Sequence, residues 1–181
     1  MFTQQLPPEL FAAQREFIRV MDANRDFVWW ADSLITEETK ELRAEYEAPV
    51  TDMENLFKEI GDLIYVVAGF YNTMPSFAPE VVDQETNQRL QTILDEAAVL
   101  LSEVTQKMKI PLPIVVLCFE IVHASNMSKI NPETGKPDRR EDGKILKGPN
   151  YTPPSMQRAV DEWKKVTQKM SAKETLGNAN G

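Results

Sequence analysis

The sequence contains very little cysteine and histidine. Its 181 residues include one cysteine, Cys118, and one histidine, His123. A single cysteine excludes a disulfide within the chain, which suits a reducing compartment. Cys118 lies in an apolar run, so we expect it to be a small buried hydrophobic residue.

Long hydrophobic runs and a positive net charge are also missing. No stretch approaches the length of a membrane span, and the first residues lack the basic start and apolar run of a secretory signal. We therefore expect a cytoplasmic protein with no membrane partner. The net charge of −8 argues against nucleic acid as a partner, because a broad surface for it would be basic.

Composition and periodicity predict one helical domain. The apolar fraction of 42% and the charged fraction of 27% are typical of a globular domain with a sizeable core. Helical periodicity predicts an all-α bundle of about six helices, over about residues 9–22, 26–47, 52–73, 79–108, 114–129 and 155–170. We expect one domain over residues 1–175, a long ordered loop over 130–154 before the last helix, and a disordered tail over 176–181.

Acidic residues recur at helical spacing on the second and third predicted helices. Glu38 and Glu41 are three positions apart and share one helix face, with Glu37 beside them. Glu59 and Asp62 do the same on the next helix. A short turn makes the two helices antiparallel neighbours, so the two pairs are expected to converge into a cage for divalent cations.

The neighbours of these acids indicate that they point inward. An apolar stripe on the second helix continues at the same period into Glu38, Glu41 and Glu45. The stripe is formed by Phe27, Trp30 and Leu34. Asp62 lies within residues 60–70, which are apolar on nearly every side and predict a buried helix. A buried carboxylate is costly unless a proton, a basic partner or a metal neutralises it.

A metal is the expected neutraliser, because the nearby basic residues Lys40, Arg43 and Lys58 fall off the inward stripes. Oxygen ligands without His or Cys favour Mg²⁺ or Mn²⁺ over zinc, and these ions usually bind together with substrate phosphates. In the alternative interpretation the first acidic segment is a solvated face with pairs such as Glu37 with Lys40. The apolar surroundings of Asp62 weigh against that alternative.

The acidic motif at residues 37–41 and 59–62 resembles the EExxE…ExxD signature of the all-α nucleoside triphosphate pyrophosphohydrolases. This superfamily includes MazG, dimeric dUTPases and phosphoribosyl-ATP pyrophosphohydrolase. Residues 123–129 and 142–154 resemble the tail of its MazG-like branch in bacteriophages and bacteria. The resemblance implies a bundle of this type that assembles as a homodimer or homotetramer, in the host cytoplasm if a phage encodes it.

The resemblance also implies a reaction, in which water attacks the α-phosphorus of a nucleoside triphosphate and releases the monophosphate and pyrophosphate. Deoxyribonucleotides are favoured, with dGTP as the first guess and dCTP or dUTP behind it. Glu37 and Glu38 are the candidate catalytic residues, with Glu37 as general base or a supporting residue. The expected ligands of two or more Mg²⁺ ions, for which Mn²⁺ can substitute, are Glu38, Glu41, Glu59 and Asp62. Phosphoribosyl-ATP as substrate and a non-catalytic helical interaction protein are the alternatives.

Candidate substrate contacts come from three segments. Trp30, beside Trp29, can stack on a nucleobase, with core packing as the alternative. Lysines around Gly148 suit phosphate binding, and the amide of Asn126 suits a sugar or base. The predicted substrate-binding residues are Trp30, Asn126, Lys129, Lys144, Lys147 and Tyr151.

Two local contacts are also predicted. Thr51 and Glu54 match a capping box that would start the third helix and so fix where its acids point. His123 either contacts substrate or hydrogen-bonds a carboxylate such as Glu120.

Overall fold

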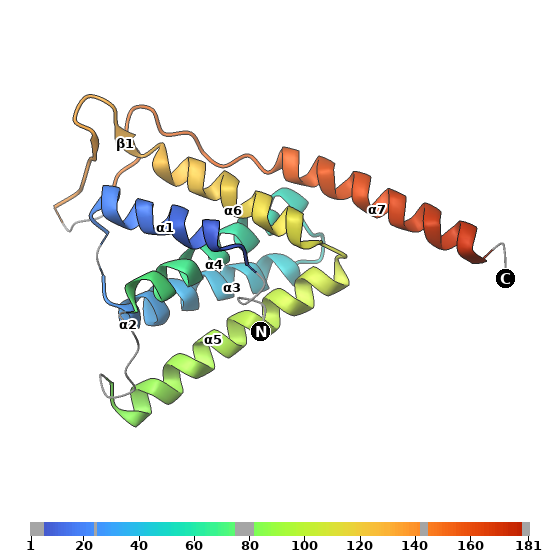
Figure 1. Ribbon diagram of the computed structural model, residues 1–181, viewed down its shortest axis with the longest axis horizontal. Coiled ribbons are helices and arrows are strands. Elements are labelled where there is room, and N and C mark those ends of the chain that lie inside the picture. The colour runs from blue at the N-terminus through green and yellow to red at the C-terminus, as the bar shows by residue number, and fades with distance from the viewer. Residues whose placement is uncertain (1–5, 24, 75–81, 142–144, 179–181) are drawn as a thin grey trace.

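The computed structural model describes residues 6–23, 25–74, 82–141 and 145–178, with side chains described as far as Met170. It confirms the predicted all-α class: the described residues form six helices, if α2, η2 and α3 are counted as one, and a small hairpin (Figure 1). The elements are α1 (Pro8–Met21), α2 (Phe27–Trp29), the π-helical η2 (Trp30–Ile35), α3 (Thr36–Tyr46), α4 (Met53–Thr73), α5 (Gln84–Lys107), α6 (Leu112–Met127), β1 (Ile130–Asn131), β2 (Lys136–Pro137) and α7 (Gln157–Asn178).

Helix α4 runs through the middle of the bundle, between α6 and α3 (Figure 1). Every residue from Leu63 to Phe70 is buried, which confirms the expected buried helix. A helix that is apolar all round can be stable in water only when neighbours cover every side. Helices α1, α3 and α6 provide that cover, so the acids at 59 and 62 lie at the edge of the core.

The rod formed by α2, η2 and α3 contains a π-helical segment, in which the backbone N–H of Thr36 donates to the carbonyl of Ala31. This wider turn changes which of the following side chains point toward the core. Ile35 is therefore fully buried whereas Leu34, a member of the predicted stripe, is half-buried. Glu38 and Glu45 are half-buried as predicted, but Glu41 is exposed.

The start of α4 is capped by Asp52, so the predicted capping box of Thr51 and Glu54 is wrong. The Asp52 carboxylate accepts hydrogen bonds from the backbone N–H groups of Glu54, at 2.9 Å, and Asn55, at 3.3 Å. The carboxylate of Glu45 in turn accepts from the Asp52 backbone N–H at 3.1 Å, which ties the end of α3 to the start of α4. Asp and Thr are both good N-caps, so two adjacent candidates cannot be separated by residue type alone.

Helix α6 lies close against α4 at Gly61. A Cβ atom at this position would lie 2.8 Å from the carbonyl oxygen of Cys118 and 2.8 Å from Cγ2 of Val122. The absence of a side chain therefore lets the two backbones meet. Cys118 is fully buried in this contact, as predicted, and burial raises the pKa of its thiol to about 12.

The Cys118 thiol is expected to be inert in the native protein. Thiolate is the reactive form, and both burial and the raised pKa suppress it. A chromogenic disulfide reagent such as DTNB at pH 8 should label less than a few per cent of the native protein and the whole population in denaturing urea, on the order of one thiol per chain. Rapid stoichiometric labelling in native buffer would contradict the close packing of α4 and α6.

Helices α5 and α6 follow one another through a sharp turn at Lys109, which has a positive φ of 52°. The predicted helix over 79–108 corresponds to α5, which packs along η2 and α3. Among the described residues no single helix is long and apolar enough to cross a membrane, and α5 with α6 passes that test only as a pair bent by 120°.

Helix α7 is anchored at its start and extends away from the bundle (Figure 1). The indole N–H of Trp163 donates to the carbonyl of Met108 at 3.0 Å, and its ring meets Phe57 edge-on at 5.9 Å. The helix continues to Asn178, past the predicted end near Met170. The predicted tail 176–181 is therefore helical as far as residue 178, and residues 179–181 lie outside the described part of the chain.

Candidate functional site

Three of the predicted metal ligands lie together. Glu38 and Glu41 from α3 and Glu59 from α4 each place one carboxylate oxygen within 4.8 Å of the others. We call these three residues the acidic cluster. Asp62, the fourth predicted ligand, lies one turn further along α4, outside this group. Glu37, which precedes Glu38 on α3, is exposed.

The acidic cluster carries more negative charge than its surroundings balance. Burial, and then the charges of Asp62, Glu41 and Glu59, raise the pKa of Glu38 to about 8. Burial also raises the pKa of Glu59, which is 9% exposed. Atom Oε2 of Glu38 and Oε2 of Glu59 are buried and have no hydrogen-bond partner among the described residues. Two buried oxygens thus need a cation or a proton.

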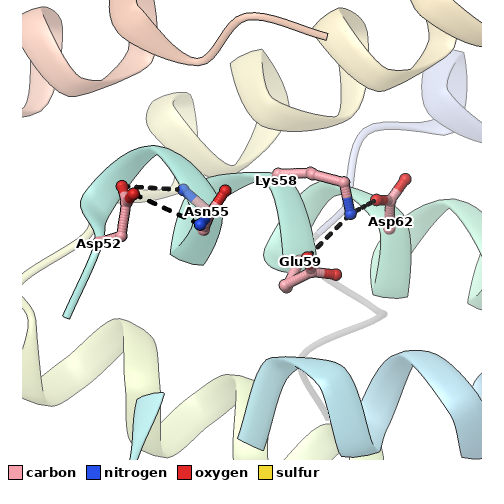
Figure 2. Close-up of polar contacts among 5 residues, drawn as sticks. All are labelled: Asp52, Asn55, Lys58, Glu59 and Asp62. Carbon is pink, nitrogen blue, oxygen red and sulfur yellow. Dashed lines mark hydrogen bonds and ion pairs between the residues drawn. The ribbon is translucent and has the colours of Figure 1, made fainter. Parts of the chain in front are cut away.

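Lys58 bends into the site, so the prediction that it falls off the inward face is wrong. Its Nζ lies 2.8 Å from Oε1 of Glu59 and 2.9 Å from Oδ2 of Asp62 (Figure 2). Lys58 lies four residues before Asp62 and shares its helix face, and the flexible aliphatic stem lets the same ammonium also reach Glu59. The other two basic residues named in the prediction, Lys40 and Arg43, are exposed.

The polar end of α6 faces the acids of α4. Lys129 is half-buried, and its Nζ donates to Oδ1 of Asn126 at 2.7 Å. Burial, together with the charge of Lys147, lowers the pKa of Lys129, and the charge of Asp62 opposes this shift. Lys129 therefore lies within electrostatic reach of both Asp62 on α4 and Lys147 on the following loop.

Tyr65 is a site residue that the sequence prediction missed. Its hydroxyl lies 3.2 Å from Nδ1 of His123, which therefore does not use the predicted partner Glu120, an exposed residue. Burial raises the pKa of Tyr65, whereas the Asn126 side chain opposes the rise. Burial lowers the pKa of His123, which keeps its ring neutral at pH 7. The signal was available, because Tyr65 is three residues after Asp62 and so shares its helix face.

The loop after α6 folds back on the end of that helix. The Thr152 backbone N–H donates to Oγ of Ser128 at 2.9 Å, and a Cβ on Gly148 would lie 3.1 Å from the Lys129 carbonyl oxygen. Lys147 is exposed, with its Nζ 4.9 Å from the centroid of the Tyr151 ring, a cation–π distance. Lys147 and Tyr151, two predicted substrate-binding residues, thus lie side by side near Lys129. Lys144, another predicted substrate-binding residue, lies outside the described residues.

The far part of this loop is fixed to α1. It forms a small hairpin, with Ile130 opposite Pro137 in the antiparallel pair β1–β2. The Arg139 guanidinium donates to the carbonyl oxygens of Met21 and Asp22, at the end of α1. The loop is therefore held at both ends, and the lysine-bearing segment lies between two anchors.

Trp30 lies in the core rather than at a ligand surface. It is 3% exposed, and a Cβ on Gly69 would lie 2.4 Å from its ring carbon Cζ3. The core-packing alternative therefore holds for Trp30, and this structure leaves its ring no free face for a nucleobase. The neighbouring Trp29 is 37% exposed, with the Arg25 guanidinium 5.4 Å above its ring.

Comparison with protein-family models, curated proteins and solved structures finds no match to this chain. The functional argument therefore depends on the motif and on the geometry around the acidic cluster. That geometry provides a set of hard oxygen ligands on α3 and α4, with Lys129 and Lys147, from the segment that follows α6, nearby. Such a set suits a divalent cation and a phosphorylated ligand better than a soft metal.

Proposed function

We propose that this chain is a Mg²⁺-dependent nucleoside triphosphate pyrophosphohydrolase of the MazG-like type. The observation that carries the proposal is the acidic cluster, in which two helices bring three carboxylates within 4.8 Å and leave two buried oxygens with no partner in the described part of the chain. An interaction surface has no use for buried, unpaired carboxylates, which cost stability. A site for divalent cations needs such carboxylates, because the bound cation offsets their cost in stability.

Each residue of the site has a role in this proposal. Glu38, Glu41, Glu59 and Asp62 would hold the cations, Mg²⁺ or in its place Mn²⁺. Bound there, the cations would supply Lewis-acid chemistry, which polarises the phosphoryl oxygens and makes a water molecule a better nucleophile. Glu37, which is exposed on α3 and precedes Glu38 in the sequence, is the proposed acceptor of a proton from that water.

The lysines on the opposite side would bind the anionic substrate. Lys129 and Lys147 would neutralise the β- and γ-phosphates and the leaving pyrophosphate, with Tyr151 as a hydrogen-bond donor. The Asn126 amide would recognise the sugar or base, and a deoxyribonucleoside triphosphate, dGTP first, is the proposed substrate. We propose a homodimer or homotetramer as the working assembly.

A nucleotide screen tests the proposal. Purified protein is incubated with each of the common NTPs and dNTPs and with phosphoribosyl-ATP, in Mg²⁺, in Mn²⁺ and in EDTA. We expect the monophosphate and pyrophosphate in equal amounts from at least one substrate, and only with a divalent cation. Nucleoside diphosphate with orthophosphate would place the cleavage elsewhere. Absence of any product across the panel would favour the helical interaction protein.

Lys147→Ala is expected to weaken substrate binding more than turnover. Lys147 is exposed and acts as a screened point charge, so its loss should raise KM by about three- to tenfold and change kcat by less than about twofold. Steady-state kinetics on the best substrate measures both constants. Lys164→Ala, on the exposed surface of α7, is the matched control and should change neither. A fall in kcat at constant KM would show that Lys147 acts in the chemical step instead.

A further inference from the structure

We infer that Lys58 is the built-in counter-ion of the cation-free site, which divalent cations must displace, so that this lysine sets the affinity of the site for them. The inference rests on the proposed function. It starts from the double contact of one ammonium with two proposed ligands, 2.8 Å to Glu59 and 2.9 Å to Asp62 (Figure 2).

Glu59 takes part both in the ion pair with Lys58 and in the acidic cluster. Its Oε1 is bound by Lys58, while its Oε2 is buried without a partner, and one of its oxygens is part of the acidic cluster. The residue is only 9% exposed, so water cannot serve the second oxygen freely. Lys58 therefore satisfies one oxygen of Glu59 and leaves the other unbalanced.

Lys58 and a divalent cation compete for the same oxygens. Mg²⁺ binds carboxylate oxygens at about 2.0–2.1 Å, which leaves those oxygens little capacity for an ammonium. The two cations would also repel each other strongly across a few ångströms of half-buried protein. The acids cannot move far, because Glu59 and Asp62 belong to the central helix α4. Lys58 is the mobile partner, since it is half-buried and its long stem can swing toward solvent without a change in the backbone.

Removing the ammonium should have opposite effects on affinity and on stability. Without Lys58, the cation no longer has to displace a competitor, so it should bind more tightly. The protein without a cation, however, loses the charge that balances Glu59 and Asp62, so it should become less stable. A lysine with only a structural role would lower stability without raising affinity.

Calorimetric titration of nucleotide-free protein with Mn²⁺ tests the inference, with Lys58→Met as the variant because methionine keeps much of the stem without the charge. We expect Lys58→Met to bind Mn²⁺ on the order of tenfold more tightly than the wild type. Lys164→Met removes the same charge from the exposed face of α7 and should stay within about twofold of the wild type.

Thermal unfolding gives a second readout that does not depend on activity. In EDTA the Lys58→Met variant should melt below the wild type, and saturating Mg²⁺ should raise its melting temperature by more than it raises that of the wild type. Lys164→Met should match the wild type in both buffers. If Lys58→Met does not fold in EDTA, Lys58→Gln is measured in its place, because its amide can still donate one hydrogen bond.

The outcomes separate this inference from the proposed function. If the wild type binds Mn²⁺ and Lys58→Met binds it equally or more weakly, the counter-ion role is refuted while the cation site stands. If neither the wild type nor any variant takes up Mn²⁺, the counter-ion role is refuted, and the nucleotide screen decides whether the proposed function stands. If Lys58→Met alone binds Mn²⁺ more tightly and shows the larger Mg²⁺-induced rise in melting temperature, the displacement of Lys58 by the cation is supported.

Discussion

Glu38→Gln is expected to abolish nucleotide turnover and, in the absence of divalent cations, to make the protein more stable. Substituting a residue that hydrogen-bonds a metal ligand typically lowers metal affinity or activity by about 10–100-fold. Substituting a ligand itself should therefore lower activity by more than about a hundredfold. The gain in stability has a separate cause. Glu38 is half-buried, is repelled by three neighbouring carboxylates, and has an oxygen without a partner. Glutamine has the same shape without the charge.

The gain in stability should depend on pH in a defined way. The pKa of Glu38 is about 8 in the folded protein, against 4.5 as its ordinary value. Folding therefore disfavours the charged form, and the stability cost grows as the pH rises from about 4.5 to about 8 and is constant above that. Melting curves in EDTA should show little difference between wild type and Glu38→Gln at pH 4 and the largest difference at pH 9.

Two further substitutions make this experiment discriminating. Asp62→Asn should also stop turnover, but it should gain less stability than Glu38→Gln because Asp62 is already paired with Lys58. Glu54→Gln, on the exposed first turn of α4, should change neither activity nor stability. Circular dichroism checks that helicity is intact in all three. Normal turnover in both Glu38→Gln and Asp62→Asn would refute the cation cage.

The convergence of acids on α3 and α4 is predictable from the sequence because two strong signals agree. Glu59 and Asp62 interrupt an apolar helix, and a short turn forces the preceding helix, with Glu38 and Glu41, to lie against it. The helix type and the approximate bounds follow from the same periodicity. The π-helical turn of η2 does not, because nothing in the residues 30–35 breaks the α-helical pattern.

Other features depend on contacts that a helical pattern does not contain. The i,i+4 spacing of Lys58 and Asp62 allows an ion pair on one helix face, but it does not tell that the long stem brings the same ammonium to Glu59 as well. The stripe of Phe27, Trp30 and Leu34 points Trp30 inward, but only the contact of its ring with Gly69 shows that no face is left for a nucleobase. Tyr65 and His123 come from two helices whose relative rotation is set by packing.

Gly61 lies inside the second acidic motif, yet its structural task is to let α6 approach α4. On helix propensity alone, Gly61→Ala should stabilise α4 by about 1 kcal/mol. The added Cβ would lie 2.8 Å from the Cys118 carbonyl oxygen, and a backbone atom cannot rotate away. We therefore expect a net loss of about 1–3 kcal/mol, as in other overpacked cores, or a fall in melting temperature of about 2–4 °C for each kcal/mol.

The same substitution should also damage the substrate side of the site, because α6 carries Asn126, and Lys129 follows directly after its C-terminal end. Moving α6 outward separates these residues from Asp62, so Gly61→Ala should raise KM at a temperature where the variant is still folded. Gly69→Ala is the matched control, since it overpacks α4 against Trp30 on another side and should lower stability without this change in KM. A Gly61→Ala protein more stable than the wild type would mean that α4 and α6 do not meet at this glycine, and the placement of Lys129 beside Asp62 would be lost with it.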